Sequence, residues 1–216
     1  MTGGVTGGPR VRRADAEARK VEILETTIAV VLERGFGNTR VADVATALGV
    51  STGLIHYHFS SKGELLAEAF RYAADADIAR VGKVLAEGTN ALERLDRALR
   101  DYVPGGRGEE VWVLWIDAWG EALRDPALRE ISEELDQAWV ALFERIIADG
   151  VAEARFTCDD PRGAAWRLAA LLDGLALHVT VHRRSMSRTE MLEHARTAAC
   201  LELGLDRGAF PKARQA

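Results

Sequence analysis

The chain has 216 residues, of which 48% are hydrophobic and 28% charged, and its formal net charge is −5 with neutral histidines. These fractions are close to the average for globular proteins and exclude a disordered, collagen-like or small disulfide-stabilised chain. The length allows one large domain or two smaller ones. The acidic total, taken alone, argues against nucleic acid as a partner.

The cysteines and the apolar stretches favour a soluble cytoplasmic protein. Cys158 and Cys200 show neither metal-ligand spacing nor a disulfide framework, so we interpret them as free thiols in a reducing compartment. The N-terminal residues lack the apolar run of a signal peptide. The longest apolar stretch, residues 168–181, is interrupted by Asp173 and His178 and is too short to span a bilayer. We therefore expect no membrane partner.

The N-terminal region changes from an arm to a helix. Residues 1–13 contain four glycines, one proline, three arginines and no acidic residue, which predicts a flexible basic arm. From residue 14, apolar side chains recur at three- and four-residue spacing and predict an amphipathic helix over residues 14–34. The glycines that follow suit a left-handed helix cap.

Two short helices come next and form a helix-turn-helix unit. The first is predicted over residues 40–48, with Thr39 as its N-cap, and Gly49 ends it. Ser51 is the N-cap of the second helix, predicted over residues 52–59.

The second helix is expected to present short or planar polar groups to a DNA major groove. Its N-terminal N–H groups favour a nearby phosphate, and Lys62 lies one turn further on the same side. Ser51 is explained equally well by N-capping alone as by phosphate contact. The polar groups on the exposed face are Thr52, Gly53, His56, Tyr57 and His58.

The predicted helix-turn-helix unit and the segments on either side of it contain a characteristic set of apolar, glycine and capping residues at defined positions. These include Ile23, Leu24, Gly35, Phe36, Val44, Ala45, Leu48, Gly49, Val50, Ile55, Phe59, Ser61, Leu65 and Leu66. Over residues 14–70 this pattern resembles the DNA-binding domain of the TetR family of transcriptional regulators. The resemblance implies a homodimer with an all-α ligand-binding C-terminal domain, in most members a repressor that a small molecule releases from DNA. Position by position it implies DNA contacts from Thr39, Arg40, Thr52, Gly53, His56, Tyr57, His58 and Lys62.

The rest of the chain also has helical patterns, with no convincing alternating strand pattern and no internal repeat. A capping box at residues 61–64 begins a helix running toward Leu85. Asp-Pro pairs and further capping residues predict helices over residues 91–103, 109–124, 126–149, 161–184 and 188–203. We therefore predict an all-α chain with a basic arm (1–13), a helix-turn-helix domain (14–70), a ligand-binding and dimerisation domain (71–205) and a tail (206–216).

Trp112, Trp115 and Trp119 fall on one face of the helix predicted over residues 109–124. Such an aromatic stripe is more often core packing than not. The alternative is the wall of a pocket for an apolar or cationic small molecule.

An acidic partner for a cation would have to come from another helix, because Asp117 and Glu121 lie opposite the tryptophans. Asp173 is the best candidate, since it interrupts an apolar run in which an unpaired charge is costly. The alternatives for Asp173 are an ion pair with Arg145 or Arg167, or exposure at a dimer rim.

Residues 115–119 (Trp-Ile-Asp-Ala-Trp) and 171–175 (Leu-Leu-Asp-Gly-Leu) are similar to the choline-responsive subgroup of the TetR family. We expect a small-molecule effector, whose identity the sequence does not give.

Small and branched residues on the last two predicted helices allow close helix contact and predict a four-helix dimer interface. Two-fold symmetry would place two recognition helices roughly 34 Å apart, so that the dimer reads a palindromic operator. The residues are Ala164, Ala165, Leu168, Ala169, Leu172, Gly174, Leu175 and Ala176, with Leu192, Ala195, Ala199 and Leu203.

An enzyme is disfavoured. His178 and His182 have a metal-capable spacing, but the adjacent glutamate of a zinc protease helix is missing and no third ligand is evident. There is no phosphate-binding glycine loop, nucleophile elbow or carboxylate pair of defined spacing. We expect no catalytic residue, no metal and no cofactor. The alternative function is a ligand-independent DNA-binding or adaptor protein.

The charges are unevenly distributed along the chain. Residues 1–62 hold eight basic and six acidic side chains, a net charge of +2, whereas residues 63–216 hold 20 basic and 27 acidic side chains, a net charge of −7. The acidic excess therefore belongs to the C-terminal domain, and double-stranded DNA remains the expected partner of the N-terminal one.

Overall fold

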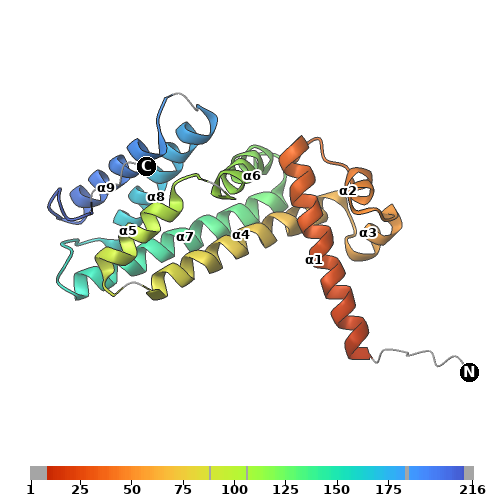
Figure 1. Ribbon diagram of the computed structural model, residues 1–216, viewed down its shortest axis with the longest axis horizontal. Coiled ribbons are helices and arrows are strands. Elements are labelled where there is room, and N and C mark those ends of the chain that lie inside the picture. The colour runs from red at the N-terminus through yellow and green to blue at the C-terminus, as the bar shows by residue number, and fades with distance from the viewer. Residues whose placement is uncertain (1–8, 88, 106, 183–184, 212–216) are drawn as a thin grey trace, which may run out of the picture.

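The computed structural model describes residues 9–87, 89–105, 107–182 and 185–211, and all regular structure in these ranges is helical. The helices pack into a small N-terminal unit at one end and a longer bundle (Figure 1), which confirms the predicted all-α fold. They are α1 (Pro9–Arg34), α2 (Val41–Leu48), α3 (Thr52–His58), α4 (Lys62–Glu87), α5 (Ala91–Tyr102), α6 (Arg107–Ala122), α7 (Pro126–Ala152), α8 (Pro161–Val181) and α9 (Arg188–Glu202).

Two segments near the ends of the described chain differ from the sequence prediction. Helix α1 begins at Pro9, so residues 9–13 are helical rather than part of a flexible arm. Proline suits a first helical position, where its missing N–H has no partner to lose. Near the other end, Phe210 falls in the predicted tail but is buried beneath the Arg196 guanidinium. Residues 1–8 lie outside the described residues.

Helices α1, α2 and α3 enclose a small core with the start of α4. Val44 and Ile55 are buried in it, and Leu48 and Val50 pack against it as partly buried residues. Gly49 ends α2 with a φ of 72°, a left-handed conformation that glycine adopts without a Cβ clash.

Helix α4 joins the two parts of the molecule. Leu65 and Ala69 are buried in the small core, whereas Leu66 and Phe70 are buried in the larger core of the bundle. Phe36, from the turn after α1, is also buried in the larger core. The small unit is therefore held to the bundle by packed side chains as well as by the chain itself.

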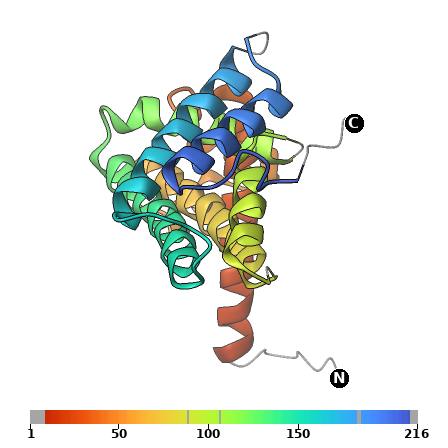
Figure 2. The same ribbon diagram turned by 90° about the vertical axis from the view of Figure 1, so that its left-hand side faces the viewer.

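The bundle is arranged around α7, which packs against α4, α5, α6 and α8. Helix α9 lies on α8 and α5, on the side of the bundle away from α4 (Figure 2). Among the described helices only α8 has the length and composition that could cross a membrane. It is longer than the apolar stretch seen in the sequence, and we interpret it as a core helix because one side of it is buried on α7 and α9.

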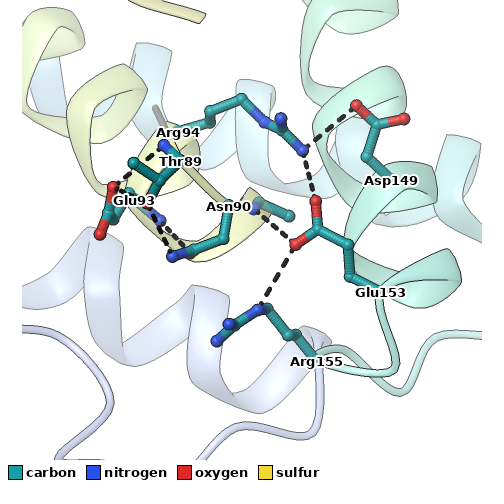
Figure 3. A network of polar contacts seen from close by, with 8 residues as sticks. Thr89, Asn90, Glu93, Arg94, Asp149, Glu153 and Arg155 are labelled. Atoms are coloured by element: carbon teal, nitrogen blue, oxygen red, sulfur yellow. Dashed lines mark hydrogen bonds and ion pairs between the residues drawn. The ribbon is translucent and has the colours of Figure 1, made fainter. Parts of the chain in front are cut away.

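A polar network closes the end of the bundle where α5 begins and α7 ends (Figure 3). Glu153 accepts the backbone N–H of Ala91 at 2.8 Å and pairs with Arg94 at 2.8 Å. Arg94 also lies 3.4 Å from Asp149. Exposed ion pairs contribute at most about 1 kcal/mol each, so this network fixes the helix ends more than it stabilises the core.

A buried ion pair instead ties α9 to α5. Asp96 accepts from Arg196 at 2.9 Å and from Arg100 at 2.9 Å, and Asp96 and Arg196 are each less than one tenth exposed. Removal of Arg196 leaves the buried Asp96 carboxylate with Arg100 as a partner, and the Arg100 side chain is exposed.

Arg196→Ala should therefore lower the free energy of unfolding by about 3 kcal/mol. Urea denaturation of the full chain measures this change. Arg71→Ala is the matched control, because Arg71 pairs with Glu134 at the surface and its loss should cost less than about 1 kcal/mol. Equal effects of the two substitutions would contradict this assignment.

Candidate functional site

Helix α3 has one buried and one exposed face. Ile55 and Phe59, at 1% and 2% exposure, fix it to the small core, and the Ser51 side chain accepts the Leu54 N–H at 3.3 Å. The face presented to solvent carries Thr52, Gly53, His56 and Tyr57, and the Tyr57 side chain is 79% exposed. The ring of His58 is half-buried and packs edge-on against that of Tyr57 at 5.1 Å.

Two exposed basic residues lie near α3 in the chain. The Lys62 ammonium group donates to the Gly37 carbonyl at 3.0 Å, which holds it against the turn after α1. Arg40 is the N-cap of α2, and its backbone N–H donates to Asp43 at 3.0 Å. Apart from Thr39, the DNA contacts predicted from the sequence remain predictions. They are Arg40, Ser51, Thr52, Gly53, His56, Tyr57, His58 and Lys62.

Thr39 corrects the sequence prediction. It is not the N-cap of α2, and its side chain is only 1% exposed. Its hydroxyl group donates to the Gly35 carbonyl at 2.8 Å and so closes the turn after α1. Because Thr39 presents no hydroxyl group to solvent, we no longer count it among the DNA contacts.

A cavity lies in the bundle, with lining residues from α4, α5, α6, α7 and α8. Its volume is about 30 Å³. The three tryptophans predicted as core or pocket wall are packed in the larger core and also line this cavity. The lining residues are Asp77, Asp101, Tyr102, Val111, Trp112, Trp115, Trp119, Asp136, Trp139 and Asp173.

The aromatic wall is held by contacts among its own members. The ring of Tyr102 lies 5.4 Å from that of Trp112 and 5.2 Å from that of Trp139, and Trp119 lies about 6 Å from Trp115. The Trp112 indole N–H donates to the Tyr102 carbonyl at 3.1 Å. Tyr102 and Trp139 could not be recognised as wall residues from the sequence, because neither has a spacing that relates it to the tryptophans of α6.

Asp173 faces the same cavity, where its Oδ1 accepts the Tyr102 hydroxyl at 2.7 Å. Burial raises the pKa of Asp173 to about 6, with the Tyr102 hydrogen bond opposing the shift and the nearby Asp136 adding to it. The alternative pairing with Arg167 is wrong, since Arg167 bonds to Glu202 at 2.8 Å. The raised pKa reflects a carboxylate whose charge nothing nearby balances.

Three further carboxylates line the cavity, and the sequence analysis missed all of them because they are far apart in the chain. Arg80 pairs with Asp77 at 2.6 Å and with Asp101 at 2.9 Å. Asp136 is half-buried, and burial raises its pKa. None of the described residues that line the cavity is basic.

Asp117 and Glu121 lie on the face of α6 opposite the tryptophans, as the helical wheel predicts, and this face contacts the small N-terminal unit. Asp117 Oδ2 accepts the Phe36 N–H at 2.7 Å. Gly35 has a φ of +82°, and a Cβ atom there would lie 3.3 Å from the same carboxylate oxygen. A Cβ atom on Gly37 would lie 3.0 Å from Glu121 Oε1, so both glycines allow a close approach of the turn to α6.

An aromatic chain runs between the same two places. The ring of Phe36 packs edge-on against that of Phe70 at 6.0 Å, and Phe70 packs edge-on against Trp115 at 5.2 Å. Trp115 is part of the cavity wall. The cavity is thus connected to the turn before α2 by directly packed side chains.

The predicted dimer interface needs correction. Eleven of its twelve residues, all except Gly174, are buried within the single chain. Small residues permit close helix contact whether the second helix belongs to the same chain or to another. The small and branched residues of α8 and α9 therefore reflect the packing of α7, α8 and α9 within one chain. The exposed apolar residues of α8 are Trp166, Leu171, Leu177 and Val181.

His178 on α8 and His182, the C-cap residue of α8, are exposed with ring centroids 5.2 Å apart. Within the described part of the chain, no group of three or more histidine, cysteine or acidic residues is placed to hold a metal ion. Cys158 and Cys200 are free.

Comparison with known proteins gives a consistent result. A family model described as bacterial regulatory proteins of the tetR family matches residues 23–69, and one described as the C-terminal part of BetI-type transcriptional repressors matches residues 91–203. The HTH-type transcriptional regulator BetI of Pseudomonas aeruginosa is 30% identical over 166 residues, which cover 74% of this chain and 80% of the relative. BetI of Serratia proteamaculans is 26% identical and covers 81% of this chain and 87% of the relative.

Solved structures extend the comparison to both parts of the fold. A putative transcriptional regulator from Saccharomonospora viridis in complex with choline is 31% identical, with a TM-score of 0.78 over 84% of this chain and 95% of that one. A putative TetR-family regulator from a Rhodococcus species is 27% identical, with a TM-score of 0.75 over 86% of this chain and 98% of that one. The chain belongs to the TetR family of transcriptional regulators and has a C-terminal domain of the BetI type.

Proposed function

We propose that the protein is a cytoplasmic, non-enzymatic repressor that binds a palindromic operator as a homodimer and leaves it when a small quaternary ammonium cation such as choline binds. The observation that carries this proposal is the cavity, in which four tryptophans and Tyr102 are combined with four carboxylates and no basic lining residue among those described. Family membership supports the regulatory role. The choline complex of the Saccharomonospora viridis regulator supports the class of effector.

The aromatic wall favours a methylated ammonium group over a primary amine. Tryptophan faces attract a cation through their quadrupole, by about 2 kcal/mol where water is excluded. A primary ammonium group requires hydrogen-bond acceptors for its three protons, which ring faces supply poorly. A trimethylammonium group presents methyl groups to the rings and needs only a nearby negative charge, which Asp173 provides.

The size of the cavity explains how binding changes the protein. A space of about 30 Å³ is small for a trimethylammonium compound, so its binding should press on the lining side chains. Because the surrounding core is close-packed, their displacement is passed to the helices that carry them. Helix α6 contributes Trp112, Trp115 and Trp119 to the wall, so it is the helix most affected.

Movement of α6 reaches DNA through Asp117, which bonds to the turn between α1 and α2. A shift of this turn changes how α2 and α3 are oriented and therefore the spacing of the two recognition helices in a dimer. The effector releases DNA if it binds more tightly to the state whose spacing fits the operator poorly. The exposed apolar residues of α8, Trp166 and Leu171 among them, offer a surface on which a second copy can pack.

Choline should release the protein from its operator, with a dissociation constant that tryptophan fluorescence and DNA-binding titrations both report.

Asp173→Asn should weaken choline binding by tenfold or more, about 1.4 kcal/mol, because the balancing charge is lost. Since the pKa of Asp173 is about 6 and only its ionised form attracts a cation, wild-type affinity should rise about tenfold from pH 5 to pH 7.5.

The Asp173→Asn variant should lose a large part of this pH dependence, and the remainder should come from Asp136, whose pKa burial also raises. Asp75→Asn, an exposed change on α4, is the control for the loss of one negative charge. If no trimethylammonium compound changes tryptophan emission or releases DNA, the ligand-independent alternative replaces this proposal.

Tyr57→Phe should weaken operator binding by about tenfold, because a hydrogen bond to a charged phosphate contributes about 1.5 kcal/mol. Thr39→Ser, which keeps the internal hydroxyl group, should leave operator affinity within about twofold if Thr39 is only structural. Fluorescence anisotropy with labelled operator DNA measures both. A greater loss for Thr39→Ser than for Tyr57→Phe would reverse the assignment made from their exposure.

Asp117→Ala should separate effector binding from DNA release. The substitution leaves the buried Phe36 N–H without an acceptor but does not touch the cavity, so choline affinity should change by less than about threefold. The ratio of operator affinities without and with choline should fall toward one. Asp117→Asn keeps an acceptor oxygen and should retain most of that ratio. A full response in Asp117→Ala would exclude this contact as the connection.

A further inference from the structure

The four carboxylates of the cavity differ in what already contacts them. Asp77 and Asp101 share the Arg80 guanidinium group. Asp173 accepts the Tyr102 hydroxyl. Asp136 has no hydrogen-bond donor and no basic partner within the described residues, although it is half-buried and lines the cavity.

Asp136 is therefore the carboxylate most available to a ligand. It lies on α7 three residues before Trp139, so the two side chains emerge on the same side of the helix and both line the cavity. Trp139 in turn packs against Tyr102, the partner of Asp173. Asp136 and Asp173 line the same small cavity, and the charge of Asp136 acts on Asp173. A ligand that fills this cavity with its cationic group at Asp173 therefore extends toward Asp136.

A carboxylate without a partner attracts a ligand hydroxyl group and repels a ligand carboxylate. It accepts a hydrogen bond from a hydroxyl group, and hydrogen bonds to charged groups are the stronger ones. It repels a second carboxylate, by about 4 kcal/mol at a separation of 4 Å and an effective dielectric constant of 20. Arg80 cannot offset this repulsion where it stands, because Asp77 and Asp101 already engage its guanidinium group.

We propose that Asp136 is the specificity-determining residue of the cavity: it selects a trimethylammonium alcohol and excludes the zwitterion in which a carboxylate replaces the hydroxymethyl group. This inference rests on the proposed function, because it takes a trimethylammonium compound as the effector. Asp173 and the tryptophans bind the trimethylammonium group that both molecules share. Asp136 contacts the part in which they differ, the hydroxymethyl group or the carboxylate.

Isothermal titration calorimetry of the full chain with three probes tests the proposal. Choline carries the hydroxyl group, propyltrimethylammonium has a methyl group in its place, and glycine betaine carries the carboxylate. The wild-type protein should bind choline about tenfold more tightly than propyltrimethylammonium, as expected for one hydrogen bond to a charged group. It should bind glycine betaine about a hundredfold more weakly than choline, through like-charge repulsion.

Asp136→Asn keeps the shape of the side chain, removes its charge and adds an N–H donor that a carboxylate can use. Choline binding should weaken about tenfold and glycine betaine binding should strengthen about tenfold, so the selectivity falls from a hundredfold to near one. Propyltrimethylammonium should lose less than choline, because it makes no hydrogen bond. Asp136→Ser, smaller and also uncharged, should likewise narrow the gap if Asp136→Asn folds poorly.

Glu133→Gln is the matched control, since Glu133 is an exposed acidic residue on the same helix and its loss should leave the selectivity unchanged. Unchanged selectivity in both Asp136 variants, with choline still bound, would overturn the role of Asp136 and leave the proposed function standing. Binding of none of the three probes by the wild-type protein would overturn both. A hundredfold selectivity that collapses only in the Asp136 variants would establish the inference.

Discussion

The hydrogen bond from the Phe36 N–H to the Asp117 carboxylate is the contact on which the two-part design depends. It joins a turn of the N-terminal unit to the outer face of a helix whose inner face walls the cavity. Gly35 and Gly37 allow the turn to approach α6 this closely, since side chains at either position would meet Asp117 or Glu121. The packing of Phe36 on Phe70 and of Phe70 on Trp115 supports the same junction from within the core. Neither part of the molecule can shift much without disturbing these contacts.

A second constraint is electrostatic. Four carboxylates line a cavity that is otherwise mostly aromatic, and Arg80 balances only part of their charge. Burial of acidic groups without a cation is unfavourable, as the raised pKa values of Asp173 and Asp136 show. A site in this condition stores a preference for positive charge, because a bound cation relieves the cost that the empty cavity carries. The same arrangement disfavours a bound anion, so the proposed affinity for a cation and the proposed exclusion of a carboxylate would have one physical origin.

Local signals in the sequence predicted local structure well. Capping residues and Gly49 located α2 and α3, and helical spacing correctly put Asp117 and Glu121 opposite the tryptophans. The predictions that were wrong or incomplete concern features that depend on tertiary packing rather than on local sequence. A shift of the α2 cap by one residue turned Thr39 inward, and the small residues of α8 and α9 proved to pack within the chain. Tyr102, Asp136 and Trp139 were missed because residues from separate helices become neighbours only when the bundle forms.

The uneven charge distribution of the chain now has a structural explanation. The net charge of −7 over residues 63–216 includes the four cavity carboxylates, which face inward rather than toward DNA. Their field at the DNA-facing surface of α3 is weakened by distance and by salt, since screening reduces charge interactions beyond about 8 Å at physiological ionic strength. An acidic effector domain and a mildly basic DNA-binding unit are therefore compatible in one chain. Part of the acidity that seemed to argue against a DNA partner therefore lies inside the C-terminal domain, in carboxylates that line a cavity.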